Sequence, residues 1–195
     1  MVRTAFVVDL DHTLIGANTT FELLQILCPV RYFILSKILK PLTLLNVVLK
    51  RDIYKLVLIT ICVKGWRREK LEQLARTYYE MIVKREPDTY LNNRLLLFLH
   101  KMRSTPKILL TASLDFIADN FKKLGLDLII SSRSYYKNDK FHSFQDLYKQ
   151  KNHVLMILLK YFDKVVVFDD DPEPEFYTLG DRVIVVRLPA HGKRT

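Results

Sequence analysis

Two aspartates near the N-terminus, Asp9 and Asp11, are spaced so that their carboxylates can act together. They follow residues 5–8, a short apolar run that ends in two valines, which predicts a strand buried on both faces. Side chains two residues apart on an extended chain point to the same side. Neighbouring carboxylates repel each other unless a cation lies between them, and Mg²⁺ prefers such oxygen ligands. The alternative is a polar turn in which Asp11 or Thr13 caps the next helix.

Two further predicted strands also run into polar side chains. Residues 107–111 form an apolar run that ends in the hydroxyls of Thr111 and Ser113, and residues 164–168 run into three acids, Asp169, Asp170 and Asp171. Because the carboxyl ends of parallel strands share one edge of a sheet, we expect these groups to meet the first two aspartates there. So many carboxylates together need a compensating cation.

Two lysines are candidates to bring positive charge to that edge. Lys149 and Lys151 precede a helix predicted over residues 152–161, which leads into the strand over 164–168. Phosphoryl transfer needs a combination of this kind: a nucleophilic carboxylate, a second carboxylate, a hydroxyl, an ammonium and an acidic metal site. The transition state of that reaction spreads negative charge, which cations and hydrogen-bond donors must neutralise.

The order of the predicted elements indicates an α/β protein with a parallel sheet. Strands alternate with helices, which favours a parallel sheet covered by helices on its faces. A long helical block over residues 18–86 interrupts this alternation after the first strand. Because the chain leaves and re-enters the sheet there, we expect the block to lie as a lid above the carboxyl edge.

Short sequence patterns predict where individual helices and turns begin and end. Thr19 or Thr20 is expected to cap the first helix, and residues 66–84 show an apolar stripe at helical spacing. The helix over 90–102 is apolar nearly all round, so we expect it to be well buried. Gly125 should end the helix over 115–124, and residues 138–139, Asn-Asp, predict a turn.

The chain is basic, and most of the excess charge lies in the helical block. Of 195 residues, 31 are Lys or Arg and 21 are Asp or Glu, which gives a net charge of +10. Residues 17–86 hold 13 of the basic residues and 6 of the acidic ones. This excess favours an anionic partner, either a phosphorylated substrate, a nucleic acid or a membrane surface, although basic residues also simply solvate helix faces.

The apolar character of the same block raises the question of a membrane. Its uncharged runs are shorter than the roughly 20 residues that a spanning helix needs, so we expect no transmembrane span. We favour a compact helical subdomain over an amphipathic helix lying on a membrane surface. The first residues enter a strand and leave no room for a signal peptide, and Cys28 and Cys62 suggest reduced thiols. We therefore expect a cytoplasmic protein, with a peripheral membrane contact as the alternative.

Four motifs together resemble those of the haloacid dehalogenase superfamily, in its phosphatase branch. Residues 9–13 read Asp-Leu-Asp-His-Thr and match the first motif, and residues 109–113 match the second, an apolar strand that ends in Thr or Ser. Lys151 matches the third motif, and residues 165–170 match the fourth, an apolar strand followed by acids. The resemblance implies a Rossmann-like core at residues 1–16 and 88–195. It also implies an inserted all-helical cap at 17–87, as in phosphoserine phosphatase-like members.

The resemblance implies a role for each motif residue. Asp9 would attack phosphorus and form an aspartyl-phosphate, and Asp11 would protonate the leaving oxygen and then activate water. Lys151 would steady Asp9 and the phosphate, with Lys149 as its rival. The implied substrate-binding residues are Thr111, Ala112, Ser113 and Asn18. The implied cofactor is Mg²⁺, held by Asp9, by Asp11 and by Asp169 or Asp170, while Asp171 would lie outside this set or cap a helix.

The implied activity is Mg²⁺-dependent hydrolysis of a phosphomonoester. Phosphoserine phosphatases carry a glutamate nine residues after the nucleophile, where this chain has Asn18, so phosphoserine is disfavoured. The basic, apolar cap suits a phosphorylated lipid head group, as in phosphatidylglycerophosphatase-like relatives, or a small phosphometabolite. The alternatives are a polynucleotide-end phosphatase, less favoured because no nucleic-acid-binding motif is present, and a non-catalytic binding protein that keeps the fold.

Overall fold

A six-stranded sheet forms the centre of the protein in the computed structural model, which describes residues 2–44, 46 and 52–191. The strands lie in the order β4-β3-β2-β1-β5-β6. All neighbouring strands are parallel except the β3–β4 pair. Their bounds are β1 Thr4–Val8, β2 Lys107–Leu114, β3 Leu128–Lys137, β4 Lys140–Gln145, β5 Lys164–Asp169 and β6 Val183–Arg187. The predicted Rossmann-like α/β fold is therefore confirmed.

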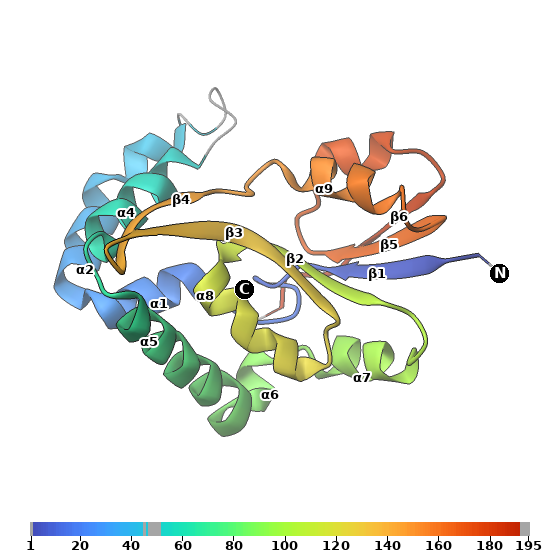
Figure 1. Ribbon diagram of the computed structural model, residues 1–195, viewed down its shortest axis with the longest axis horizontal. Coiled ribbons are helices and arrows are strands. Elements are labelled where there is room, and N and C mark those ends of the chain that lie inside the picture. The colour runs from blue at the N-terminus through green and yellow to red at the C-terminus, as the bar shows by residue number, and fades with distance from the viewer. Residues whose placement is uncertain (1, 45, 47–51, 192–195) are drawn as a thin grey trace.

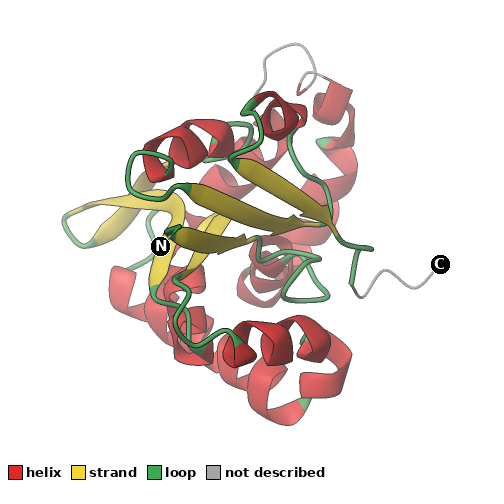
Figure 2. Ribbon diagram, turned by 90° about the vertical axis from the view of Figure 1, so that its right-hand side faces the viewer, coloured by secondary structure: helices red, strands yellow, loops and turns green. Residues whose placement is uncertain are grey.

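Helices cover both faces of this sheet (Figure 2). On one face lie α9 (Lys151–Leu158) and the short helix η4 (Pro174–Thr178), which pack on Ala5 and Val7 of β1. On the other lie α7 (Asn93–Lys101) and α8 (Asp115–Ala118), which pack in the cluster that holds Phe6 and Val8. Alternate residues of β1 thus enter opposite cores, which explains why this strand is almost wholly apolar.

The helical block lies beyond the carboxyl ends of the strands (Figure 1). Its helices are α1 (Thr19–Leu27), α2 (Pro29–Ile38), η1 (Lys40–Leu42), α4 (Ile53–Val63), α5 (Arg68–Glu80) and the π-helix η2 (Met81–Arg85), and the short helix α6 (Pro87–Tyr90) follows the block. The hairpin of β3 and β4 reaches out to this block, where the Gly65 and Arg68 N–H groups donate to the Phe141 and Asp139 carbonyls. No helix in the described part of the chain is long and apolar enough to cross a bilayer.

Several local predictions are confirmed. Leu71, Tyr78 and Ile82 of the predicted stripe are buried. Gly125 ends η3 (Asp119–Leu124) in a left-handed conformation, at φ 83°. The predicted turn follows β3, and its two residues, Asn138 and Asp139, both have positive φ, as a two-residue hairpin turn requires.

Two local predictions are wrong. The cap of α1 is Asn18, whose side chain accepts from the Phe21 N–H at 3.1 Å, because the Thr19 hydroxyl is engaged elsewhere. Helix α7 is buried on one side only, with Leu97 61% exposed and Phe98 37% exposed. Its apolar run continues round the helix, but only one side of it lies against the sheet.

Candidate active site

The carboxyl edge of the sheet gathers the side chains that the sequence motifs singled out. Asp9 follows β1, which lies between β2 and β5 at the point where the strand order reverses. This switch point is where open α/β sheets bind their ligands. Thr111 lies on β2 and Asp169 ends β5, so both flank Asp9. Asp9 and Asp169 are buried, only 7% and 3% exposed.

Lys151, the first residue of α9, links the two aspartates. Its Nζ donates to Asp9 Oδ1 at 2.7 Å and to Asp169 Oδ2 at 3.2 Å. The N-terminus of α9 is held in turn by Glu173, which accepts from the Lys151 N–H. Lys149 is exposed, and its Nζ lies over the Tyr148 ring, 5.5 Å from the centroid. Of the two candidate lysines, the structure therefore brings Lys151 to the aspartates.

Burial makes Asp9 a weak acid in the absence of a metal. The pKa of Asp9 is raised to about 7, chiefly by desolvation, with smaller increases from the charges of Asp169 and Asp11, although Lys151 lowers it. Desolvation alone would lower the pKa of Lys151, but the charges of Asp9 and Asp169 raise it overall. Lys151 therefore remains an ammonium, and the site holds more negative charge than one lysine can balance.

Three carboxylates of this cluster are close enough to hold one metal ion. Oxygens of Asp9, Asp169 and Asp170 lie within 4.8 Å of one another. Thr13 orients Asp170, since its hydroxyl donates to Asp170 Oδ1 at 3.1 Å and accepts from the Asp170 N–H at 2.9 Å. Asp171 is exposed, and its N–H donates to Asp169 Oδ1. The donor set is all oxygen and the cluster carries excess negative charge, so these residues suit a hard divalent cation.

Asp11 is held between the helical block and the sheet. Its Oδ1 accepts both the N–H and the hydroxyl of Thr19 at 2.8 Å, and its Oδ2 accepts the Ser113 hydroxyl at 2.7 Å. His12 adopts a left-handed conformation, at φ 60°, which turns the chain sharply after Asp11. Sequence reasoning missed the role of Thr19, although a hydroxyl at the start of the next helix was the available signal.

The remaining predicted substrate-binding residues have structural partners. The Thr111 hydroxyl is fully buried and accepts from the Ser113 N–H at 3.1 Å. The Ala112 carbonyl accepts from Ser132 Oγ. Asn18 caps α1, so its side-chain oxygen is already engaged at the start of the helical block.

A buried lysine of α4, Lys55, was missed by sequence reasoning. Its Nζ donates to the Ala112 carbonyl at 2.6 Å and to Asp146 Oδ1 at 2.7 Å. It therefore ties the helical block to the strand that carries Thr111. No spacing rule relates a lysine at 55 to residues 112 and 146, so the sequence offered no signal for this contact.

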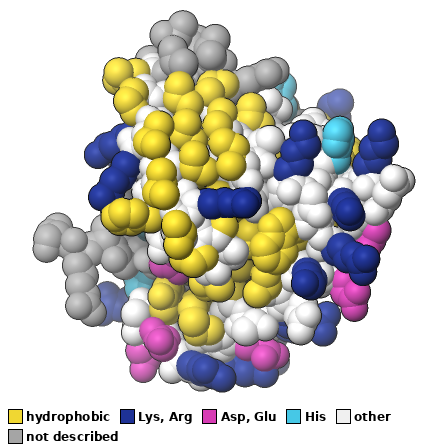
Figure 3. All heavy atoms as spheres, turned by 90° about the vertical axis from the view of Figure 1, so that its left-hand side faces the viewer, with side chains coloured by type: hydrophobic (Ala, Val, Ile, Leu, Met, Phe, Trp, Pro, Cys, Tyr) yellow, Lys and Arg dark blue, Asp and Glu magenta, His cyan; other side chains and the backbone are white. Residues whose placement is uncertain are grey.

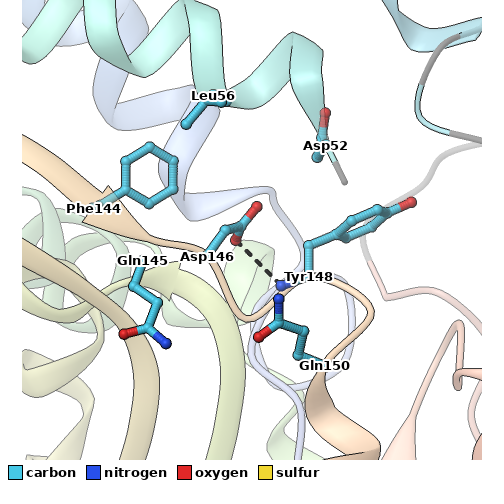
Figure 4. A pocket seen from close by; sticks show the side chains of 7 residues that line it. All are labelled: Asp52, Leu56, Phe144, Gln145, Asp146, Tyr148 and Gln150. Carbon is cyan, nitrogen blue, oxygen red and sulfur yellow. Dashed lines mark hydrogen bonds between the residues drawn. The ribbon is translucent and has the colours of Figure 1, made fainter. Parts of the chain in front are cut away.

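A pocket of about 340 Å³ opens beside this contact (Figure 4). It lies between the start of α4 and the segment that joins β4 to α9, and Asp146 and Tyr148 are among the residues that line it. The Tyr148 N–H donates to Asp146 Oδ1. Gln150, which also lines it, directly precedes Lys151. The lining residues are Asp52, Leu56, Phe144, Gln145, Asp146, Tyr148 and Gln150. The pocket thus lies next to the segment that leads into Lys151, the first residue of α9.

Comparison of the whole chain places this fold among known structures. No protein-family model and no curated protein sequence matches the chain. It is similar to a protein of unknown function from Bordetella pertussis Tohama I, with a TM-score of 0.64 and 14% identity over 94% of this chain and 99% of that one. It is also similar to phosphoserine phosphatase from T. onnurineus, with a TM-score of 0.60 and 14% identity over 97% and 88% of the two chains.

A third similar structure is described as a phospho-aspartyl intermediate analogue of phosphoserine phosphatase. Its TM-score is 0.57, with 17% identity over 87% of this chain and 79% of that chain. At these identities the likeness is one of fold. The chain therefore shares the Rossmann-like α/β fold of these structures, the fold that its motifs predict.

Proposed function

We propose that this protein is a Mg²⁺-dependent phosphomonoester hydrolase that acts through an aspartyl-phosphate on Asp9. The observation that carries the proposal is the contact of Lys151 with both Asp9 and Asp169 at the carboxyl edge of the sheet. The similarity in fold to phosphoserine phosphatases, one of them described as a phospho-aspartyl analogue, adds support. Asp9, Asp169 and Asp170 would hold the metal, together with the Asp11 carbonyl.

The reaction proceeds in two steps that use this chain's own side chains. In the first, an Asp9 carboxylate oxygen attacks phosphorus, the bond to the leaving oxygen breaks, and Asp11 protonates that oxygen. In the second, Asp11 takes a proton from water, which attacks the aspartyl-phosphate and releases phosphate and free Asp9. Lys151 orients Asp9 and neutralises charge that develops on the phosphoryl oxygens. A bound Mg²⁺ would supply additional charge neutralisation.

The hydroxyls around Asp11 fit its assigned role. Thr19 and Ser113 hold its carboxylate in one orientation, which reduces the entropy lost when it reaches the leaving oxygen. Thr111 and the residues that follow it line the same edge and would bind the phosphoryl oxygens. We assign the substrate to phosphorylated lipid head groups or small phosphometabolites, because the helical block beside the site is basic and apolar, which suits an anionic group attached to an apolar or small body.

Phosphate release from a panel of phosphomonoesters tests the proposal. The panel holds an aryl phosphate, phosphoserine, sugar phosphates, a phospholipid phosphate and a 3′-phosphorylated oligonucleotide, each with Mg²⁺ and with EDTA. We expect Mg²⁺-dependent turnover that Asp9→Asn abolishes and that Asp181→Asn, an exposed aspartate, retains. Equal turnover in the two variants would refute Asp9 as the nucleophile, and no turnover of any substrate would favour a binding protein.

A further inference from the structure

Helix α2 carries an apolar surface that faces away from the rest of the protein. Val30, Phe33, Ile34 and Ile38 are 71%, 61%, 49% and 66% exposed, and we call these four residues the outer face. No residue of α2 is buried. Surface helices ordinarily present charged or polar side chains on the side opposite the core. The outer face therefore lacks the polar surface that a solvent-facing helix has.

The opposite side of α2 packs against the hydrophobic core of the protein. Tyr32, Leu35 and Leu39 pack as partly buried residues against the hydrophobic core. They recur at three- and four-residue spacing, as one side of a helix does. The outer face is thus a second apolar side, and no described part of the chain buries it.

The charged residues of α2 and of the adjoining η1 are all basic. Residues 29–42 contain three Lys or Arg and no Asp or Glu. Arg31, Lys37 and Lys40 are exposed, and Lys37 Nζ lies 3.9 Å from the centroid of the Phe33 ring. In Figure 3, hydrophobic side chains gather on the side of the molecule that carries α2 and α4, with Lys and Arg among and beside them, whereas most Asp and Glu lie below them or at the right-hand edge.

We propose that the outer face of α2 docks on the surface of an anionic lipid bilayer. Apolar side chains interspersed with basic ones suit the boundary between acyl chains and negative head groups. The ammonium of Lys37 lies over the Phe33 ring in a cation–π contact, so a positive charge lies on the apolar surface itself, where it can meet an anionic head group. The ten residues of α2 span about 15 Å, so the helix lies in the interface and does not cross the bilayer.

A second copy of this chain is a weaker candidate for the occupant. Two outer faces related by twofold symmetry would bring Lys37 and Arg31 of each copy against the same residues of the other. Residues 29–42, which carry the outer face, hold no acid that could pair with them, so like charges would oppose the contact. An anionic bilayer meets the same surface with the opposite charge.

Membrane docking would place the proposed phosphatase at a bilayer surface, and the test of docking does not depend on phosphatase activity. The full chain is mixed with phosphatidylcholine vesicles, with or without phosphatidylglycerol, and the bound fraction is measured by sedimentation. We expect binding to the anionic vesicles, and at least about tenfold weaker binding for the Phe33→Glu, Ile38→Glu double variant. Lys37→Gln should weaken binding by about fivefold, the contribution of one basic residue near an anionic surface.

Controls separate docking from folding and from catalysis. Leu97→Glu, at a residue of α7 that is 61% exposed, should bind vesicles as the wild type does. Hydrolysis of a water-soluble aryl phosphate should be equal in all four proteins if the variants fold. Wild type that does not bind anionic vesicles, or a double variant that binds them equally, overturns the docking surface whatever the phosphatase result. So does a dimer in size-exclusion chromatography that only the double variant breaks.

Discussion

At the scale of single residues, Lys151 is the group on which the candidate site most depends. It alone among the described residues donates a side-chain hydrogen bond to Asp9, and it also contacts Asp169. Lys151→Met would leave two buried carboxylates facing each other without their cation. We expect kcat to fall by about 10²–10³, the usual cost of one donor to a charged transition state, as measured by steady-state hydrolysis of an aryl phosphate.

Lys149 supplies the matched control two residues earlier. Its side chain is exposed and lies over Tyr148, so Lys149→Met should keep kcat within about twofold, because exposed charges contribute little. Loss of turnover in the Lys149 variant with retention in the Lys151 variant would reverse the assignment.

The pKa of Asp9 predicts a conflict between stability and function at the same residue. Burial raises it from 3.8 to about 7 in the folded, metal-free protein, so between these values the folded state binds more protons than the unfolded state. The free energy of unfolding should therefore fall as pH rises from about 4 to about 7 and level off above it. Asp9→Asn removes this loss and should be the more stable protein at pH 8 in EDTA, although we expect it to be inactive.

Urea unfolding between pH 4 and pH 8 measures this effect. We expect Asp9→Asn to gain about 1 kcal/mol or more over the wild type at pH 8, and to show no advantage at pH 4. Asp181→Asn, which changes an exposed aspartate, should follow the wild-type curve. A variant less stable than the wild type at pH 8 would show that the ion pair with Lys151 outweighs the desolvation of Asp9.

At the scale of elements, Lys55 holds helix α4 against strand β2. Its side chain is 8% exposed, and it shares Asp146 with the Ser132 hydroxyl. Removing one partner of a buried ion pair costs about 3–5 kcal/mol, because the other charge remains buried. We expect Lys55→Met to lose about 3 kcal/mol of unfolding free energy, and to raise KM because the helical block is no longer fixed beside Ala112.

The test for Lys55 is a double-mutant cycle with Asp146→Asn, read by urea unfolding and by steady-state kinetics. The two changes should be strongly non-additive, since they remove the same contact. Lys64→Met, which changes an exposed lysine one residue beyond α4, serves as the control and should leave both measurements near the wild-type values. Additive effects would mean that Lys55 and Asp146 act separately.

At the scale of the whole molecule, the plan of the fold could be predicted because it follows from local patterns. Apolar strands ending in acids or hydroxyls identified Asp9, Thr111 and Asp169, and the parallel sheet then places them on one edge. What could not be predicted depends on contacts between distant segments. Lys55 meets residues 112 and 146 across the fold, and Leu97 is exposed because the sheet covers only one side of α7. The choice between Lys149 and Lys151 required the position at which α9 begins.

Because the site carries excess negative charge, we expect a bound metal ion to stabilise the whole fold. An ion that binds only the folded protein stabilises it by about 2.7 kcal/mol when its concentration is 100 times its Kd, which raises the Tm of a chain this size by roughly 5–10 °C. Mg²⁺ should therefore raise the Tm of the wild type relative to EDTA, and the increase should be greater at pH 8 than at pH 6, because protons compete for Asp9 around its pKa of about 7.

Two variants test whether Asp170 holds the metal. Asp170→Asn should reduce the increase in Tm that Mg²⁺ causes, and Asp181→Asn should leave it intact. An equal Mg²⁺ response in these two variants, measured by scanning calorimetry, would exclude Asp170 from the metal site while leaving the contact of Lys151 with Asp9 to be judged by kinetics.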